Sequence, residues 1–425
     1  MPPKRNASQN DRKPIKTDFT LIAATLSDCN LPKPIILSIL TRLPVKSLHR
    51  FKCVCMPWLT LISSLNFIKL HRDQTSQNPQ NHSLIIHSID GDNYHKMSLL
   101  NINSTENQQP INLLNPFSAP FLQMELVGSL HGLVCLSCLP LCQNIVLWNP
   151  ALNLCKAIPP SSRNWGENSP LKFSIGFGYD EMTDDFKVVR IACLRPTTGN
   201  YTSGPSSQVL RSDAEVYSAN SGSWKRVSVD FPFVVGHTRN NVIAKGVPYW
   251  TALIPDPSRL RKYCEVLVWF DVRNEMFKHV LIPELERHSG IGVRFVEWKG
   301  TLACLVYSPT KERVDFVDVL VYNDDGKKGC CWEKISTHGP IGLKMEGSVQ
   351  CSKDGVILAE TSEGTLFLYD PLTNGVRKFF IAEAQKNSYE AFSHTESLVC
   401  LEGMEQVVEL DKDKYCSIME DLGIN

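Results

Sequence analysis

The chain has 425 residues, of which 43% are hydrophobic and 21% are charged, and this length allows two or three domains with full-sized cores. Its 44 basic and 44 acidic residues give a formal net charge of zero, so it lacks the basic excess with which nucleic-acid binders neutralise phosphates. The apolar run at residues 133–142 is about half of the ~20 residues that a membrane-spanning helix needs, and no secretory signal is visible. We therefore expect no nucleic-acid partner, no membrane partner, and a cytoplasmic and/or nuclear location.

The first 28 residues are polar, contain prolines, and carry basic residues spread among acidic ones. Such a composition cannot bury enough apolar surface to order the chain, so we predict a disordered N-terminal arm over residues 1–28. A nuclear-import signal is the alternative reading of its basic residues, which the lack of clustering disfavours.

The stretch Leu31–His71 carries the periodicity of short amphipathic helices. A first helix is indicated by the apolar residues at 35, 36, 39, 40 and 43, and Pro44 ends it. A second helix follows with apolar residues at 48, 51, 54 and 55, and Pro57 is suited to the first turn of a third. Three helices in about 40 residues bury only part of their apolar surface against one another, because so small a module has much surface for its volume. The remaining surface predicts a partner.

This stretch resembles the F-box. The resemblance is carried by Leu31-Pro32, Ile39-Leu40, the runs 42–48 and 50–55, Trp58, Leu61-Ile62 and Phe67. It implies that the partner is a Skp-family adaptor and, through the adaptor, a cullin. It further implies an adaptor-facing surface, some of whose members also belong to the core of the module: Leu31, Pro32, Ile36, Leu40, Leu43, Pro44, Leu48, Val54 and Trp58. The alternative is a plain three-helix cap that packs on the rest of the chain.

After this module, the polar stretch 72–83 has no apolar periodicity and predicts a hinge between domains. From residue 84 onward, short apolar runs are separated by Gly, Pro, Asn and Asp, which is typical of an all-β architecture. We therefore expect a disordered arm at 1–28, an F-box at 29–73, a linker at 74–83, a β domain at 84–415 and a C-terminal tail at 416–425.

A repeat runs through the β region. Apolar runs end in a large residue followed by a turn, at Leu100, Trp148, Tyr217, Phe270, Tyr322 and Tyr369. Their spacing of about 50 residues suits kelch-sized propeller blades. Glycine-flanked strands precede several of them, at Gly132, Gly246, Gly300 and Gly355. The predicted fold class is thus α+β multidomain: a three-helix F-box followed by an all-β, kelch-like propeller of about six blades.

The β region resembles the F-box associated domain of plant F-box proteins, which is related to kelch propellers. The likeness is carried by HGLVCL, LWNPALN, FGYDEMTDDFKVVRI, VYSANSGSWK and GVPYW, between about Gly128 and Tyr369. For closure of the ring we expect residues 406–411 to pair with residues 83–89, because closure removes exposed sheet edges.

The 15 cysteines are odd in number and scattered through strand-like segments. In a reducing compartment they behave as small buried hydrophobes. Cys135 and Cys138, with Cys142 nearby, form a CxxC, but no second pair follows at the spacing of a zinc finger. The 11 histidines stand singly. We expect no metal and no cofactor.

No nucleophile motif, phosphate-binding loop or dinucleotide fingerprint is present, so we expect no catalytic residues and no enzyme activity. The resemblance instead implies the substrate-recognition subunit of a Skp–cullin–F-box (SCF) ubiquitin ligase, which holds a target protein on its propeller for ubiquitination and proteasomal degradation. Two alternatives remain: a ligase-independent F-box scaffold, and a propeller enzyme with an unrecognised site.

Target binding is expected in the loops, because blade strands carry the stability while loops can vary. The longest Gly-, Pro- and Ser-rich insertion, Arg195–Ser212, contains Tyr201 and Arg211. A second insertion, Pro159–Pro170, contains Trp165. Tyr, Arg and Trp are the residue types most enriched at binding hot spots, so these three residues are the candidate target contacts.

Overall fold

The computed structural model of the chain describes residues 32–103, 109–116, 123–139, 144–163, 170–194, 211–235, 242–256, 263–282, 292–309, 314–323, 331–343, 345–361, 363–381, 384–386 and 388–407. The predicted arm 1–28 and tail 416–425 lie outside these residues. The chain divides into two compact units, Met1–His71 and Arg72–Asn425, named here the helical unit and the propeller unit. Within the described residues, no helix is long and apolar enough to cross a membrane.

The helices begin where the sequence places prolines. The described helices are α2 (Lys33–Leu40), α3 (Val45–Phe51), α4 (Met56–Ile62) and α5 (Leu65–Gln77). Pro32 and Pro44 are the N-cap residues of α2 and α3, and Pro57 lies in the first turn of α4. Proline fits these positions because the first backbone N–H groups of a helix have no intrahelical acceptor. The three predicted helices are present, and α5 is a fourth that the sequence analysis did not separate.

A small core holds the helical unit together. Its buried apolar residues are Ile36, Leu40, Val45, Leu48, Leu61, Ile62 and Phe67. His71 closes this core, because its Nε2–H donates to the carbonyl of Leu43 at 2.9 Å. Burial lowers the pKa of His71 below 6.5, which favours the neutral ring.

The predicted hinge is instead folded. Helix α5 continues to Gln77, and a short 3-10 helix, η1 (Pro79–Asn81), follows. The polar side chains here bond to the local backbone: Ser76 Oγ donates to the carbonyl of Asp73 at 3.1 Å, and Asn78 Oδ1 accepts from the amide of Gln80 at 3.2 Å. Such local bonds order a segment that has no apolar stripe, which is why periodicity missed it.

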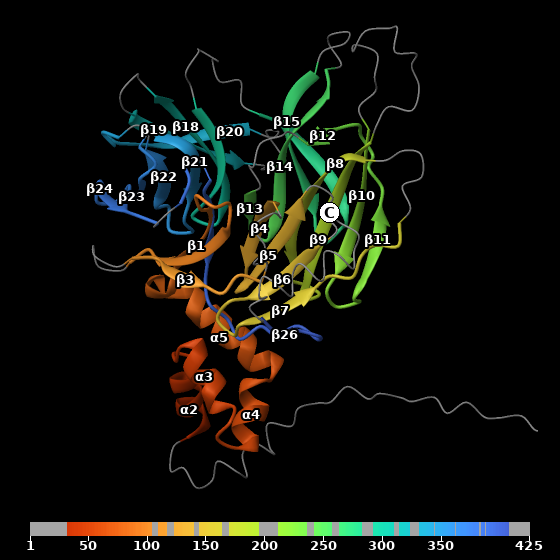
Figure 1. Cartoon of the computed structure of the whole chain (residues 1–425), viewed down its shortest axis with the longest axis vertical. Helices are drawn as coiled ribbons and strands as arrows, with labels where there is room; N and C mark the ends of the chain where they lie inside the picture. Colours follow the sequence, from red (N-terminus) through yellow and green to blue (C-terminus); the bar gives the residue numbers. More distant parts are fainter. Residues whose placement is uncertain are drawn as a thin grey trace, which may run out of the picture. The chain divides into compact units, whose positions relative to one another are not determined.

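The described strands of the propeller unit form six sheets, named here blades 1 to 6 (Figure 1). Blade 1 contains, from the innermost strand outward, β25 (Glu390–His394), β1 (Ser83–Ile89), β2 (His95–Asn101) and β3 (Ile111–Leu113). Blade 2 contains β4 (Gln123–Leu130), β5 (Leu133–Leu139), β6 (Ile145–Asn149), β7 (Leu154–Ala157) and β26 (Glu405–Gln406). Blade 3 contains β8 (Pro170–Asp180), β9 (Asp185–Leu194), β10 (Arg211–Ser218) and β11 (Ser223–Val227).

In blade 4 two short strands share the innermost position, β12 (Val234–Val235) and β13 (Val242–Ala244), followed by β14 (Val247–Pro255), β15 (Tyr263–Asp271) and β16 (Met276–Leu281). Blade 5 contains β17 (Gly292–Trp298), β18 (Thr301–Pro309), β19 (Val314–Asn323) and β20 (Cys331–His338). Blade 6 contains β21 (Met345–Cys351), β22 (Ile357–Thr361), β23 (Leu366–Asp370) and β24 (Gly375–Phe379). The predicted propeller of about six blades is confirmed.

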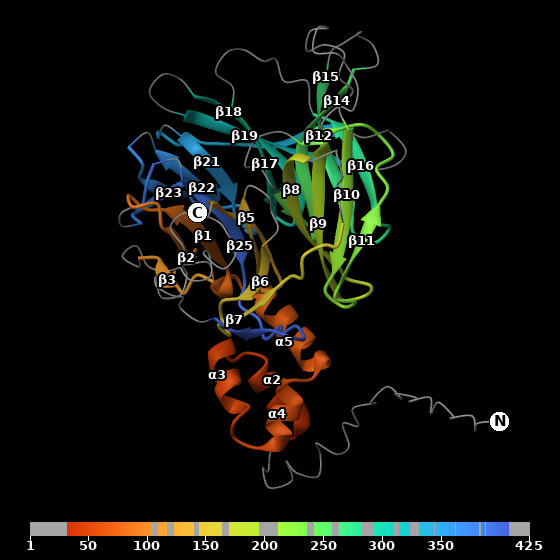
Figure 2. The same cartoon turned by 45° about the vertical axis from the view of Figure 1, so that its right-hand side comes forward.

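The ring is closed by strand β25. Contacts run from β25 to β4, β8, β13 and β14, β17, β21 and back to β25. Strand β25 pairs with β1, with Ser83 opposite His394, so blade 1 joins the two ends of the propeller sequence (Figure 2). The predicted closing segment was wrong, because Gln406 belongs to β26 and pairs with β7 at the outer edge of blade 2. Both segments are strand-like, and only the assembled ring decides which one fills the vacant innermost position.

Turn chemistry explains the repeat. Each large residue that marks it lies near the end of the third strand of a blade: β2, β6, β10, β15, β19 and β23. The residue that follows often caps the turn to the fourth strand. Asn149 Oδ1 accepts from the amides of Ala151 and Leu152, and Asp271 Oδ1 accepts from those of Arg273 and Asn274. Asn and Asp recur because their short side chains bond to the backbone two residues ahead.

The glycine-flanked strands are the second strands, β5, β14, β18 and β22. Three of them follow two-residue loops, His131-Gly132, Lys245-Gly246 and Lys299-Gly300, in which both residues have positive φ (51° and 84° in the first). This is the backbone of a type I′ hairpin, and glycine adopts it without steric cost. The end of the propeller that carries these loops is named here the hairpin end, and the opposite end, where second strands connect to third strands, is the loop end.

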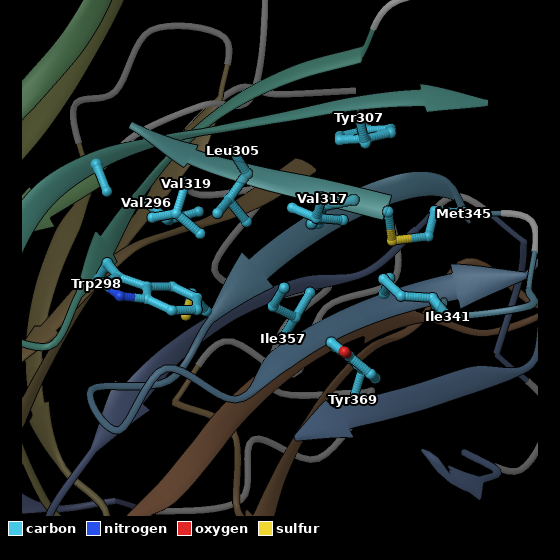
Figure 3. Close-up of a cluster of buried hydrophobic side chains, with 14 of the residues drawn as sticks. Val296, Trp298, Leu305, Tyr307, Val317, Val319, Ile341, Met345, Ile357 and Tyr369 are labelled. Carbon is cyan, nitrogen blue, oxygen red and sulfur yellow. The ribbon is translucent and has the colours of Figure 1, made fainter. Parts of the chain in front are cut away.

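Buried apolar side chains fill the spaces between blades. Between blades 5 and 6, Trp298 and Leu305 face Ile357 and Tyr369, and all are nearly or fully buried (Figure 3). Between blades 3 and 4, the ring of Trp250 occupies the space that a Cβ atom at Gly176 would take. The core is thus distributed around the ring, with each blade packed on both faces.

Candidate functional site

The helical unit exposes large apolar side chains. Ile35 and Ile39, one turn apart on α2, are 46% and 48% exposed, and Val54 and Met56, which flank the start of α4, are 65% and 70% exposed. Leu59 on α4 is 37% exposed. These five, on or beside α2 and α4, are named here the exposed apolar residues of the helical unit; Leu65 and Leu70 on α5 are exposed as well, at 71% and 48%. Apolar surface of this kind is the main driving force for protein association, so this unit is suited to a protein partner.

The predicted adaptor-facing residues separate into two groups. Pro32, Pro44 and Val54 are exposed, and Leu43 and Trp58 are half-buried, with the Trp58 ring edge-on to Phe51 at 5.0 Å. Ile36, Leu40 and Leu48 are buried in the core of the helical unit, so they support a surface and do not form it. Leu31 lies outside the described residues.

Ile35, Ile39, Met56 and Leu59 were not among the predicted surface residues. A signal was present, since α2 holds two adjacent apolar pairs, 35/39 and 36/40, each spaced by one turn. A core this small takes only one of the two pairs. The geometry of α2 turns the pair 36/40 inward and leaves the pair 35/39 in solvent.

At the loop end, blade 3 brings the two predicted insertions to one edge. Pro170 and Arg211 both lie opposite Leu194 in register, so β8, β9 and β10 terminate together there. Arg211 begins β10, and Ser212, buried, donates to the carbonyl of Phe233. The predicted insertion therefore ends before Arg211, because these two residues belong to a strand. Trp165 and Tyr201 lie outside the described residues.

The start of the other insertion is held on blade 3 by polar contacts. The indole N–H of Trp224 donates to the carbonyl of Pro159 at 2.7 Å, and Ser161 Oγ donates to Glu215 Oε2 at 2.7 Å. Arg163 forms an ion pair with Asp213. The chain is thus fixed two residues before Trp165, so blade 3 sets where this insertion leaves the propeller.

A buried charge pair lies beneath these contacts. Arg190 Nε donates to Glu215 Oε1 at 2.6 Å, and only 4% and 3% of these residues are exposed. The guanidinium also faces the rings of Trp224 and Phe173, at 4.9 Å and 5.2 Å from their centroids. Paired in this way, both charges can remain buried, and the pair fixes the direction of the blade 3 side chains that hold the insertion.

His131, Cys135 and Cys138 are structural residues. No group of three or more His, Cys, Asp and Glu side chains there is arranged to hold a metal ion. Cys135 and Cys138 both lie in β5, three positions apart, so they point to opposite faces of the sheet. Burial is the main cause that lowers the pKa of His131 to about 4, with Arg72 and Lys353 acting in the same direction. His131 packs edge-on against Tyr179 at 4.3 Å, a structural contact.

Two family models match the chain. The F-box domain matches residues 29–70, and the F-box associated beta propeller domain matches residues 83–403. The two matches fall on the helices and on the six blades, respectively.

Several Arabidopsis thaliana proteins are similar along most of their length. An F-box/kelch-repeat protein is 27% identical over 286 residues, which cover 65% of this chain and 72% of the relative. An F-box protein is 25% identical over 377 residues, 80% of this chain and 85% of the relative. Another F-box protein is 26% identical over 319 residues, 74% of this chain and 69% of the relative. In each case the similarity extends well beyond the helical unit.

Proposed function

The chain belongs to the plant F-box proteins that carry a C-terminal F-box associated propeller domain, and from this premise we propose that it is the substrate-recognition subunit of an SCF ubiquitin ligase. Its helical unit binds a Skp-family adaptor and, through it, a cullin. Its propeller unit binds a target protein. The observation that carries this proposal is the joining in one chain of an F-box with exposed apolar residues to a closed propeller with its own core.

The exposed apolar residues of the helical unit support the adaptor assignment. Ile35 and Ile39 expose apolar surface on one face of α2, and Met56 and Leu59 expose apolar surface on α4. Burying one such side chain contributes about 1.5–3 kcal/mol, so a few of them suffice as anchors of an interface. Pro32, Pro44, Val54, Leu43 and Trp58 remain proposed contacts.

The proposed role is holding, with no chemistry of its own. Ubiquitin transfer belongs to other subunits of the ligase, and the chain contributes by keeping the target near them. The loop end of blade 3 is the proposed target-binding region, with Trp165, Tyr201 and Arg211 as candidate contacts. The ordered segment Pro159–Arg163 supports this choice, because a preorganised loop loses less entropy when it binds.

The adaptor assignment is tested with the full chain and a purified Skp-family adaptor. We expect Ile35→Asp with Ile39→Asp to abolish complex formation in size-exclusion chromatography, because two carboxylates would have to be desolvated at the interface. Leu372→Asp is the matched control, since Leu372 is 80% exposed in blade 6. Equal adaptor binding by the parent chain, the double variant and the control variant would refute the assignment.

Target binding and ligase activity need a separate test. Replacing residues 196–209 by a short Gly-Ser linker keeps Leu194 and Arg211 paired, so we expect the melting temperature and adaptor binding to stay unchanged. Proteins captured from proteasome-inhibited plant tissue by the parent chain, and lost with the replaced loop, are the candidate targets. Their ubiquitination by the reconstituted ligase is the expected result. Capture without ubiquitination would favour the ligase-independent scaffold.

A further inference from the structure

The segment that connects α5 to the first propeller strand contains a buried histidine between two acceptors. His82 is 6% exposed. Its Nδ1 lies 2.6 Å from Asp354 Oδ2, and its Nε2 lies 2.9 Å from the carbonyl oxygen of Ser76. Asp354 belongs to the turn between β21 and β22 at the hairpin end, and Ser76 belongs to the last turn of α5. The ring therefore links the end of the helix to blade 6.

Both neighbours of the ring are acceptors, and this decides its protonation. A backbone carbonyl only accepts, so Nε2 must carry a proton, and an ionised carboxylate only accepts, so Nδ1 must carry one as well. A neutral imidazole has a single N–H and would leave one of the two contacts as a lone pair facing an oxygen. The geometry is that of an imidazolium.

Residues 72–83 have a second attachment at blade 3, which lies across the propeller axis from blade 6. Arg72 Nη1 donates to the hydroxyl of Tyr179 at 3.0 Å, and its guanidinium lies 5.3 Å from the centroid of the same ring. Tyr179 in turn donates to Asp184, which lies 3.8 Å from Arg72. Residues 72–83 are thus attached to blade 3 at their start and to blade 6 near their end.

We infer that residues 72–83 form a clamp across the hairpin end, and that this clamp is held closed by a protonated His82 and released as the histidine loses its proton. A clamp at this place sets how firmly the end of α5 is held on the propeller. The clamp thus gives a pH-dependent control of how residues 72–83 are held on the propeller.

The charged groups around the imidazole of His82 determine how the clamp responds to pH. The hydrogen bond to Asp354 is the largest effect on the pKa of His82 and raises it above 6.5, against the opposing effects of burial and of Lys353. On α5 the neighbouring charges are Arg72 and Asp73, which lie 3.7 Å apart and offset each other. Because the folded pKa is raised, the stabilisation is complete below the ordinary value of the histidine and is lost as the pH rises through the folded value.

The first test measures the proton itself. In the full chain labelled with 15N-histidine, with the His82 signals assigned through His82→Gln, we expect both ring nitrogens to be protonated at pH 6.5 and the ring to titrate above this value. A His82 that carries one proton at pH 6.5 would overturn the inference.

The second test measures the hold on α5. Asp354→Asn removes the carboxylate and keeps the shape, and Asp92→Asn is the same change at an exposed turn. Losing a charge-assisted hydrogen bond weakens the local hold on the backbone, so we expect amide exchange in residues 72–83 to be about tenfold faster, or more, in Asp354→Asn and unchanged in Asp92→Asn. Unchanged protection of β22 and β23 verifies that blade 6 stays folded. Equal exchange of residues 72–83 in the parent chain and both variants would refute the clamp.

Discussion

The two units differ in how completely they bury their largest apolar side chains. In the propeller unit, Trp148, Trp250, Tyr217 and Tyr369 are at most 1% exposed, since every blade is covered on both faces by its neighbours. In the helical unit, several of the largest apolar residues stay in solvent, Met56 among them at 70%. A closed ring has no terminal blade, so each blade has a neighbour on both faces, whereas a few short helices cannot surround all of their apolar side chains. The exposed apolar residues of the propeller unit, such as Leu372 at 80%, lie on its outer surface. The buried apolar residues of the propeller unit mainly stabilise its fold, whereas the exposed apolar residues of the helical unit are suited to association with a partner.

The largest expected loss of stability follows when a buried charge of the propeller unit loses its partner. Arg190→Leu leaves Glu215 buried with Ser161 as its remaining side-chain donor, and we expect the free energy of unfolding to fall by about 3–5 kcal/mol. Urea denaturation measures this loss. Arg226→Leu is the matched control in the same blade, because the side chain of Arg226 is 68% exposed and its pairing with Asp213 contributes little. The double change Arg190→Leu with Glu215→Leu should recover part of the loss.

Two adjacent residues of α2 differ in burial, so substitutions at them separate stability from adaptor binding within the helical unit. Leu40 is 2% exposed and Ile39 is 48% exposed. Leu40→Ala should cost about 2–5 kcal/mol of stability, because it removes buried atoms and leaves a cavity, whereas Ile39→Ala should cost less than about 0.5 kcal/mol. Adaptor affinity, measured by calorimetry, should fall for Ile39→Ala despite its normal fold. A stable Leu40→Ala protein would contradict the assignment of this residue to the core.

A glycine tests how completely the space between blades 3 and 4 is filled. A methyl group at Gly176 would overlap the ring of Trp250, so we expect Gly176→Ala to lower the free energy of unfolding by about 1–3 kcal/mol. Gly91→Ala is the control, as a Cβ there meets no atom within 4 Å. Thermal unfolding followed by near-ultraviolet circular dichroism compares the two. Equal melting temperatures would mean that the blades have room to separate.

The smallest expected effect concerns an acidic turn residue of blade 4. Burial acts to raise the pKa of Asp271, but bonds from Lys278 and Asn274 outweigh it and lower this pKa to about 2. A lowered pKa stabilises the fold above the ordinary value near 3.8 and loses this effect as the pH falls toward 2. The stability difference between the parent chain and Asp271→Asn should therefore narrow between pH 4 and pH 2. A constant difference across this range would assign the effect of the substitution to turn geometry alone.

The order of the two units, the all-β character of the second and the positions of its turns follow from local patterns in the sequence. These features depend on residues close together in the chain. Asn149 and Asp271 cap turns that begin at their own positions, and Gly132 and Gly246 supply the positive φ of two-residue loops. The spacing of such turns then repeats once per blade, so the approximate number of blades followed from local chemistry.

Which apolar surfaces are buried and which strands pair depends on contacts between residues far apart in the chain. The pairs 35/39 and 36/40 of α2 are similarly apolar, and only the folded helical unit shows that the pair 36/40 is the buried one. Segments 390–394 and 405–406 both extend as strands, and the vacant place beside β1 selects the first. His82 reads as a polar linker residue until Asp354, which is 272 residues away, comes within 2.6 Å of its ring. Contacts between residues so far apart in the chain leave no local pattern, because each partner is ordinary in its own neighbourhood.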